Sequence, residues 1–379
     1  MPFSQLQPSW AQKVSALLFP SNRRRDIDGL RGLAILLVIF FHAGWLKGGF
    51  IGVDIFIVIS GYFMGRSAFM QHPFQAERFV FRRLYRLLPA LLGMVAIVSA
   101  AMLWWVLPSD RADIAQNGAY ALIYLSNTWA SHHVGYFEGQ SIAYPFLHTW
   151  SLSLEMQFYL VIFLIAWLLP KLKNRQTLLF SMLAGSFLYS LFATYKADHA
   201  AYYSLASRLC EFSLGTVIWL LPPLPQSRLF SAVRYAVALG VLLLCGIFYD
   251  LSAASPSPMV LLPCLATMLI IMQPDAFTRR ILEILSPIGV ISYSLYLWHW
   301  PAIVCASYFA PVYGAKMALV LLGALVAGSL SYMLLERPLL AYEKAAHPLA
   351  VRRGGLLMVG LCGLLAAVLS WVSFVSRVY

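Results

Sequence analysis

The chain has 379 residues, of which 61% are hydrophobic and only 11% are charged, and its mean hydropathy is +0.75. Many apolar runs approach the roughly 20 residues that cross a bilayer as a helix, and the alternating pattern of a membrane β-barrel is absent. The composition therefore predicts an all-α polytopic membrane protein, with no separate soluble domain. A formal net charge of +12 invites a nucleic-acid interpretation, which the positions of the charges argue against.

The apolar runs predict eleven membrane-spanning helices. In chain order these are 30–46, 49–66, 88–107, 148–169, 177–195, 206–221, 230–249, 258–273, 288–308, 315–335 and 355–375. The first twenty residues hold no continuous apolar region and no cleavage site, so the first span is expected to direct insertion. Segment 67–87 predicts a cytoplasmic interfacial helix running up to Pro89, and 108–147 predicts an outer amphipathic segment that lies on the surface or dips partway in.

The 27 basic residues divide unequally between the two sides that these spans define. The side of the N-terminus receives 21 of them and the opposite side only six, namely Lys47, Arg111, Lys196, Arg208, Lys316 and Arg377. By the positive-inside rule the N-terminus is cytoplasmic, and an odd number of spans places the C-terminus outside. The excess charge thus indicates orientation in a bacterial inner membrane, and no nucleic-acid partner is expected.

Familiar signatures of other chemistries are missing from the sequence. All five cysteines lie inside predicted spans without a CxxC pair, so neither disulfides nor a zinc site is expected. There is no nucleophile elbow, P-loop, dinucleotide fingerprint or HExxH motif. His132, His133 and Glu138 form only a weak metal or acid–base signal on an outer loop. We expect no bound metal and no permanent cofactor.

The stretch RGLAILLVIFFH places Arg31 and His42 at the two ends of one apolar run. Eleven steps of 100° make three turns plus about 20°, so on a helix both side chains share one face, roughly 16 Å apart. Polar groups inside a membrane are costly and normally face a cavity or the bundle interior. This stripe is therefore predicted to line a path into the protein.

Other helices deliver polar side chains to a similar depth. Counting about 1.5 Å per residue places His42, Asp54 and His299 near the middle of the membrane, and Glu155 nearer the outer leaflet. Each has a structural alternative: His299 could serve only a packing hydrogen bond, and Asp54 could hold a neighbouring helix. Glu211 is expected to pair with Arg208 one turn earlier.

Arg82, Arg83 and Arg86 gather at the predicted cytoplasmic mouth, with Arg31 near them. Guanidinium groups bind phosphate through paired hydrogen bonds, which favours a phosphate-bearing donor at this mouth. The alternative is that these arginines enforce topology and contact anionic lipid.

Six blocks, in order, resemble the acyltransferase-3 family of integral membrane acyltransferases. They are DIDGLRGLAILLVIFFHAG, GFIGVDIFIVISGYFMG, FRRLYRLLPAL, HTWSLSLEMQFYL, ISYSLYLWHWP and YMLLERPLL, spread over about residues 26 to 340. The resemblance implies a ten-helix core that passes an acyl group from cytoplasmic acyl-CoA to a hydroxyl on an extracytoplasmic glycan or glycolipid. The family's Arg-x10-His motif falls on Arg31 and His42, and its Arg-x-x-Arg motif on Arg83 and Arg86. Many members append an extracytoplasmic hydrolase domain of the SGNH type. Here we expect one extra span after the core instead, so the work of that domain would be absent or done by a partner.

Residues and resemblance together predict an O-acyltransferase that uses acetyl-CoA or another acyl-CoA as its donor substrate. The predicted catalytic residues are His42, Arg31 and Glu155, with His42 as general base, while Arg82, Arg83 and Arg86 bind the donor. Further residues predicted to line the site are Asp54, His299, Tyr296 and Trp150. The acceptor is expected to be a polysaccharide or lipid-linked saccharide, and polysaccharide-synthesis proteins or a second copy of the chain are candidate partners.

Two other functions remain open from the sequence. A transporter or flippase of acyl donor or glycolipid would need the polar path but no base at mid-depth. Another class of membrane acyltransferase, with a lone histidine and an asparagine, would modify lipids or peptides. The predicted organisation is a cytoplasmic segment at 1–25, an acyltransferase domain at 26–345, and an additional span with a short outer terminus at 346–379.

Overall fold

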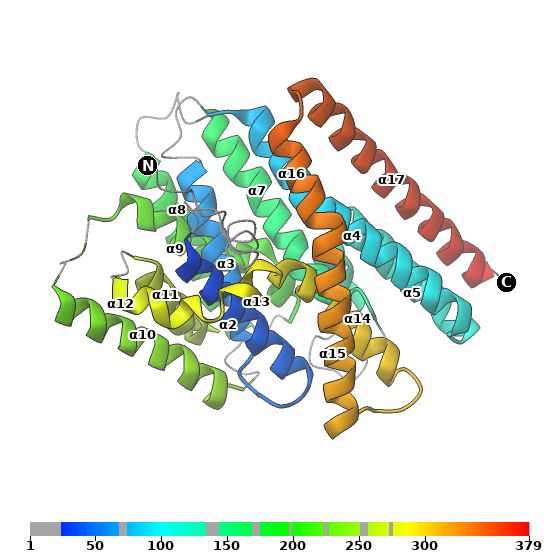
Figure 1. Ribbon diagram of the computed structural model, residues 1–379, viewed down its shortest axis with the longest axis horizontal. Coiled ribbons are helices and arrows are strands. Elements are labelled where there is room, and N and C mark those ends of the chain that lie inside the picture. The colour runs from blue at the N-terminus through cyan, green and yellow to red at the C-terminus, as the bar shows by residue number, and fades with distance from the viewer. Residues whose placement is uncertain are drawn as a thin grey trace, which may run out of the picture.

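A computed structural model describes residues 24–67, 74–133, 144–168, 175–196, 199–222, 224, 227–250, 257–272 and 276–378. Throughout these ranges the regular secondary structure is helical, as the sequence predicts (Figure 1). The predicted cytoplasmic segment 1–25 lies almost entirely outside the described residues, as do Glu138 and the terminal Tyr379. The fold class is thus confirmed as an all-α polytopic membrane fold.

Six of the described helices are long and apolar enough to cross a membrane. They are α4 (Ala76–Trp105), α7 (Trp150–Leu168), α8 (Arg175–Tyr195), α10 (Arg228–Phe248), α17 (Pro348–Val378), and α15 (Gly314–Ser331) as it continues through the π-helical turn η9 (Tyr332–Glu336) into α16 (Arg337–Ala345). Shorter helices occupy the remaining predicted spans: α2 (Arg25–His42), α3 (Ile51–Gly65), α9 (Leu205–Val217), α11 (Leu261–Ile271) and α14 (Ser292–Ser307). Every predicted span therefore contains a helix, while the number of crossings stays a prediction.

One of the two predicted segments between the spans differs from expectation. The predicted interfacial helix at 67–87 is continuous with the following span, because α4 runs unbroken through Pro89. A proline inside a helix removes one backbone hydrogen bond, which a helix fixed by its neighbours tolerates. The predicted outer segment contains α5 (Pro108–Leu122), which packs along α17 and α4 and buries Ile114, Asn117 and Leu122.

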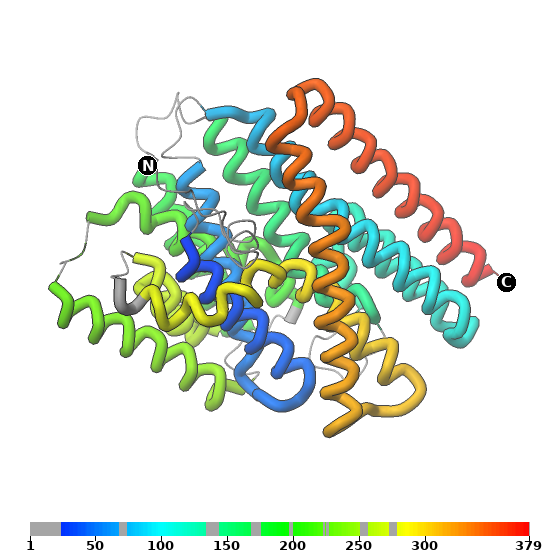
Figure 2. Tube along the Cα trace, viewed as in Figure 1, coloured from blue at the N-terminus to red at the C-terminus, as the bar shows by residue number. Residues whose placement is uncertain are grey.

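The helices α4, α5 and α17 form one flank of the molecule, and α10 forms the other (Figure 2). Between the flanks, α3 packs closely against both α2 and α9. At the α3–α9 contact, a Cβ added to Gly61 would lie 2.0 Å from the Phe212 carbonyl oxygen, and one added to Gly215 would lie 2.0 Å from the Val58 carbonyl oxygen. Glycine at these positions lets the two backbones approach, as is common where membrane helices cross.

Candidate active site

A cavity lies between α2, α3, α4, α7 and α14. Residues of α3 at spacings of three and four, Val53, Phe56, Ser60 and Phe63, give it one wall. Its remaining lining is Arg31, Ile57, Ile59, Met64, Arg86, Leu87, Ser151, Leu152, Glu155, Tyr159, Phe212, Ser292, Tyr293 and Tyr296. An apolar enclosure with a few converging polar groups is the usual form of a small-molecule site.

Glu155 is the carboxylate of this cavity. It accepts hydrogen bonds from the hydroxyls of Ser60 on α3 and Tyr159 one turn along α7. Ser60 lies in the second half of α3, which the charge distribution predicts to be the cytoplasmic half, and this disagrees with the predicted position of Glu155 nearer the outer leaflet. Counting about 1.5 Å per residue along each helix assumed that neighbouring helices end at one level, which these contacts contradict.

The four predicted arginines occupy different positions. Arg31 and Arg86 line the cavity. The Arg83 guanidinium lies 3.3 Å from the centre of the Phe79 ring and donates to the Phe79 carbonyl at 2.5 Å, so it packs along its own helix. Arg82 is exposed. The cationic groups at the cavity are therefore Arg31 and Arg86, with Arg83 beside them against the Tyr159 ring, 5.1 Å from its centre.

His42 is hydrogen-bonded to a second histidine, His299. Its Nδ1 lies 2.9 Å from Nε2 of His299, and the two ring planes differ by only 24°, with centroids 5.1 Å apart. Nδ1 of His299 lies 2.7 Å from the Tyr296 carbonyl oxygen. The Trp300 ring contacts His42 at a centroid distance of 4.6 Å. His299 is fully buried, whereas His42 is partly exposed.

Tyr296 separates the cavity from the histidine pair. Its side chain lines the cavity, its backbone carbonyl bonds to His299, and its hydroxyl donates to the His148 carbonyl at 2.7 Å. Arg31 lines the cavity but His42 is not among the lining residues. The two ends of the stripe on α2 therefore have different surroundings: Arg31 borders the cavity, and His42 contacts His299 and Trp300.

Sequence reasoning missed His148, Ser60 and Tyr159. His148 is buried, and neither ring nitrogen has a hydrogen-bond partner within the described residues. Its ring centroid lies 5.7 Å from that of His299 and 5.4 Å from that of Tyr296. For two of them the sequence did contain a signal, their helical spacing from Glu155. His148 lies seven residues, about two turns, before Glu155, and Tyr159 lies four residues after it.

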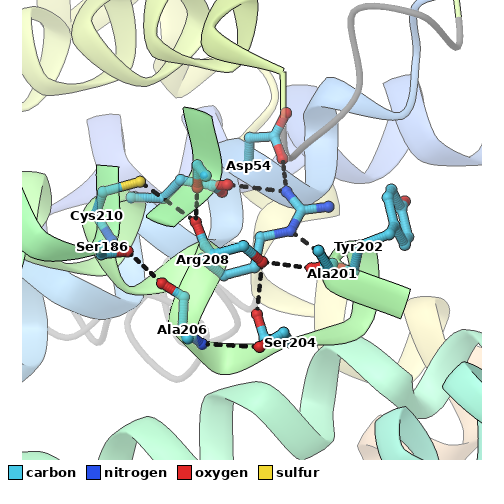
Figure 3. Close-up of polar contacts among 11 residues, drawn as sticks. Asp54, Ser186, Ala201, Tyr202, Ser204, Ala206, Arg208 and Cys210 are labelled. Atoms are coloured by element: carbon cyan, nitrogen blue, oxygen red, sulfur yellow. Dashed lines mark hydrogen bonds and ion pairs between the residues drawn. The ribbon is translucent and has the colours of Figure 1, made fainter. Parts of the chain in front are cut away.

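Asp54 and Trp150 belong to a different cluster, on the side of α3 that faces α9. Asp54 forms an ion pair with Arg208 at 2.7 Å, and Arg208 also pairs with Glu211 at 2.9 Å (Figure 3). The Arg208 guanidinium lies 5.4 Å from the centre of the Trp150 ring. These residues are buried and are not among those lining the cavity.

The pairing of Glu211 with Arg208 is confirmed. For Asp54 the contacts support the structural alternative, a carboxylate that holds a neighbouring helix, because its partner is Arg208 rather than a histidine. The prediction that Asp54 and Trp150 line the site does not agree with this cavity. Depth alone could not reveal it, since depth does not specify which face of α3 a residue occupies.

The outer histidines serve as local caps. Nδ1 of His132 bonds to the Thr128 carbonyl and Nδ1 of His133 to the Trp129 carbonyl, each four residues earlier in α6 (Ser126–His133). Within the described ranges no group of three or more histidine, cysteine or acidic side chains could hold a metal ion.

The structure thus brings arginines, a carboxylate and a hydrogen-bonded histidine pair close together inside a helical membrane bundle. The model of the family described as "Acyltransferase domain" matches residues 24–336. The chain is 60% identical over 373 residues to a Komagataeibacter xylinus protein named "Putative membrane-bound transacylase BcsY", covering 98% of this chain and 97% of that protein.

More distant relatives carry a reaction in their names. The chain is 33% identical to the O-acetyltransferase OatA of Staphylococcus aureus, over 83% of this chain and 56% of that protein. It is 30% identical to the peptidoglycan O-acetyltransferase OatA of Listeria monocytogenes, over 73% of this chain and 49% of that protein. No solved structure matches the chain. The chain belongs to the acyltransferase-3 family and is a membrane acyltransferase.

Proposed function

We propose that this protein is an O-acyltransferase of the bacterial inner membrane. It moves an acyl group, in the first instance acetyl, from cytoplasmic acyl-CoA to a hydroxyl of an extracytoplasmic glycan or lipid-linked saccharide. The observation that carries the proposal is the placement of a cationic cavity and a bonded histidine pair on two sides of one residue, Tyr296. The names of the O-acetyltransferase relatives support the reaction class.

The donor half of the site is the cavity. Arg31 and Arg86 line it and present guanidinium groups, which bind phosphate oxygens through paired hydrogen bonds. The walls beyond them are largely apolar, with Phe56, Ile57 and Tyr293 among them. A pantetheine arm entering past the arginines would bring its thioester against Tyr296 and Ser151.

The acceptor half contains His42. This residue is partly exposed, which leaves room for a hydroxyl to approach it. The hydroxyl oxygen attacks the thioester carbonyl and forms a new C–O bond, while its proton passes to His42. The C–S bond then breaks, and the departing thiolate of CoA takes that proton.

Contact between the two halves requires Tyr296 to move. Its hydroxyl is held by the Ser151 hydroxyl and the His148 carbonyl, each at 2.7 Å. Neutral hydrogen bonds contribute only about 0.5–1.5 kcal/mol each, so the side chain can turn aside at modest cost. Glu155, bonded to Ser60 and Tyr159, lies beside the arginines, and in this account it organises the donor end of the cavity rather than orienting His42.

The test uses purified protein in proteoliposomes with radiolabelled acetyl-CoA outside and candidate saccharide acceptors in the lumen. The proposal predicts CoA release that depends on acceptor, together with labelled acceptor. Label entering the lumen as intact acetyl-CoA, without CoA release, would instead indicate a transporter. Label on lipid or peptide alone would indicate the other class of membrane acyltransferase.

A further inference from the structure

We propose that His299 is a positioning residue that fixes the tautomer of His42, leaving Nε2 of His42 as the unprotonated nitrogen that takes the acceptor's proton. The inference deepens the proposed function and rests on it for the catalytic consequence. The tautomer itself rests only on the contacts of the two histidines.

The hydrogen bonds determine first the tautomer of His299 and then, through it, the tautomer of His42. A backbone carbonyl only accepts, so Nδ1 of His299, 2.7 Å from the Tyr296 oxygen, carries a proton. In a neutral imidazole the other nitrogen is then an acceptor, which makes Nε2 of His299 the acceptor in its 2.9 Å contact with His42. His42 donates through Nδ1–H, and its own Nε2 keeps a lone pair.

The reverse arrangement requires a charged His299. If Nε2 of His299 also carried a proton, it would donate to Nδ1 of His42, and Nε2 of His42 would become a donor. His299 is 0% exposed, and within the described residues its ring contacts backbone carbonyls of its own helix and His42, with no carboxylate among its partners. A buried cation without a counter-ion is strongly disfavoured. The neutral pair is therefore the resting arrangement.

The surroundings leave Nε2 of His42 available. No hydrogen bond within the described part of the chain reaches that atom, and the ring is partly exposed. The Trp300 ring at 4.6 Å and the hydrogen bond to His299 hold the imidazole from two directions. A base held in one orientation by a third group is the arrangement used by nucleophile–base–orienter sites in general.

His299 also acts after the proton moves. When Nε2 of His42 takes the acceptor's proton, the ring becomes an imidazolium whose Nδ1–H still donates to Nε2 of His299. A hydrogen bond from a charged donor is stronger than a neutral one, so His299 stabilises the charged form that exists during attack. His299 receives no proton, and the proton on His42 leaves with the CoA thiolate.

Three substitutions separate this role from simple packing. His299→Gln places an amide oxygen near the position of Nε2 and can still accept from His42. His299→Phe keeps the ring volume but has no acceptor, and His299→Ala removes both. We expect kcat to fall about 10²-fold or more in the Phe and Ala variants, with the KM for acetyl-CoA within about threefold, and to recover at least about tenfold in the Gln variant.

A spectroscopic measurement tests the tautomer without any activity. Protein labelled with ¹⁵N in histidine gives distinct signals for protonated and bare ring nitrogens, and the His42 signals are those lost in His42→Gln. The expected result is a protonated Nδ1 and a bare Nε2 in the wild type, with a mixture of tautomers in His299→Phe. A bare Nδ1 in the wild type, or full activity in a folded His299→Phe protein, would overturn the proposal.

The activity measurements and the spectroscopic measurement together distinguish a failure of this inference from a failure of the proposed function. If His42→Gln retained normal acyl transfer, the general-base account would fail while the tautomer could still be as assigned. If the tautomer were reversed and His42→Gln were inactive, the proposed function would stand and the role of His299 would fall. Thermal unfolding of each variant in detergent confirms that the compared proteins are folded.

Discussion

The hydroxyl of Tyr296 and Oγ of Ser151 lie 2.7 Å apart and join α14 to α7 where the cavity meets the histidine pair. This hydrogen bond holds the side chain that stands between the proposed donor and acceptor halves. Its strength therefore bears on how often the two halves are connected.

Tyr296→Phe removes the hydroxyl and its hydrogen bonds to Ser151 and to the His148 carbonyl while keeping the ring. We expect the ring to turn aside more often, so that water reaches the thioester without an acceptor. Loss of one to two neutral hydrogen bonds corresponds to a rise of up to about tenfold in acceptor-independent CoA release. Ser151→Ala, which removes one of the two partners, should give a smaller rise. Equal background release in all three proteins would contradict a separating role for Tyr296.

Arg86 and Arg82 form a matched pair for donor binding, since both lie on α4 but only Arg86 lines the cavity. Arg86→Ala should raise the KM for acetyl-CoA by about tenfold or more, because a hydrogen bond to a charged group contributes about 1.5–3 kcal/mol. The effect should fall on KM, since the contact is present in both the ground and transition states. In Arg82→Ala the KM for acetyl-CoA should stay within about threefold of the wild type. A larger rise in KM in Arg82→Ala than in Arg86→Ala would show that Arg82, and not Arg86, contacts the donor.

Arg31 offers a second test at the cavity. Arg31→Lys retains the charge but loses the planar guanidinium, so it should be impaired less than Arg31→Ala and more than the wild type. Steady-state kinetics against acetyl-CoA and against a shortened acetyl-pantetheine lacking the nucleotide phosphates locate the contact. A defect of the same size with both donors would show that Arg31 does not act on those phosphates.

The Asp54–Arg208–Glu211 cluster is expected to support stability rather than chemistry. Removing one partner of a buried ion pair leaves an uncompensated charge and typically costs about 3–5 kcal/mol. Arg208→Ala leaves the carboxylates of Asp54 and Glu211 without their shared cation and should therefore lower the unfolding temperature clearly. Asp54→Ala leaves the Arg208–Glu211 pair intact and should cost less, with kcat/KM per folded molecule within about threefold of the wild type. Replacing Asp54, Arg208 and Glu211 together by leucine, methionine and leucine should destabilise less than Arg208→Ala. A stable but inactive Asp54→Ala protein would return Asp54 to the site.

The orientation in the membrane is testable by single-cysteine labelling. Lys316 near the start of α15 and Arg353 near the start of α17 are exposed, and the charge distribution predicts that they lie on opposite sides. A membrane-impermeant maleimide added to intact spheroplasts should label Lys316→Cys but not Arg353→Cys in a background without the five native cysteines. Labelling of Arg353→Cys would reverse the predicted topology.

Periodicity and apolar length predicted the helices well, because in lipid the backbone must satisfy its own hydrogen bonds. Charge spacing within one helix also predicted the Arg208–Glu211 pair, since residues three apart on a helix are neighbours. What these signals could not supply was the rotation of each helix. Asp54 and Ser60 belong to the same helix, yet one faces Arg208 and the other faces the cavity.

The histidine pair shows the same limit from the other direction. Depth placed His42 and His299 in one layer, but a layer does not distinguish a bonded pair from two separate residues. Their contact depends on the packing of α14 against α2, which brings together positions 257 residues apart. His299→Ala is consequently not an independent control for His42, although residue depth alone would suggest it.

The most direct measurement of the central claim is single-turnover acyl transfer by His42→Gln, with acetyl-CoA binding measured on the same preparation. A positioned general base contributes about 10²–10⁴-fold, and glutamine cannot take a full proton. The account predicts that the transfer rate falls by at least about 10²-fold while the Kd for acetyl-CoA stays within about threefold, because His42 does not line the cavity. A folded His42→Gln protein that transfers acetyl at near the wild-type rate would contradict the account.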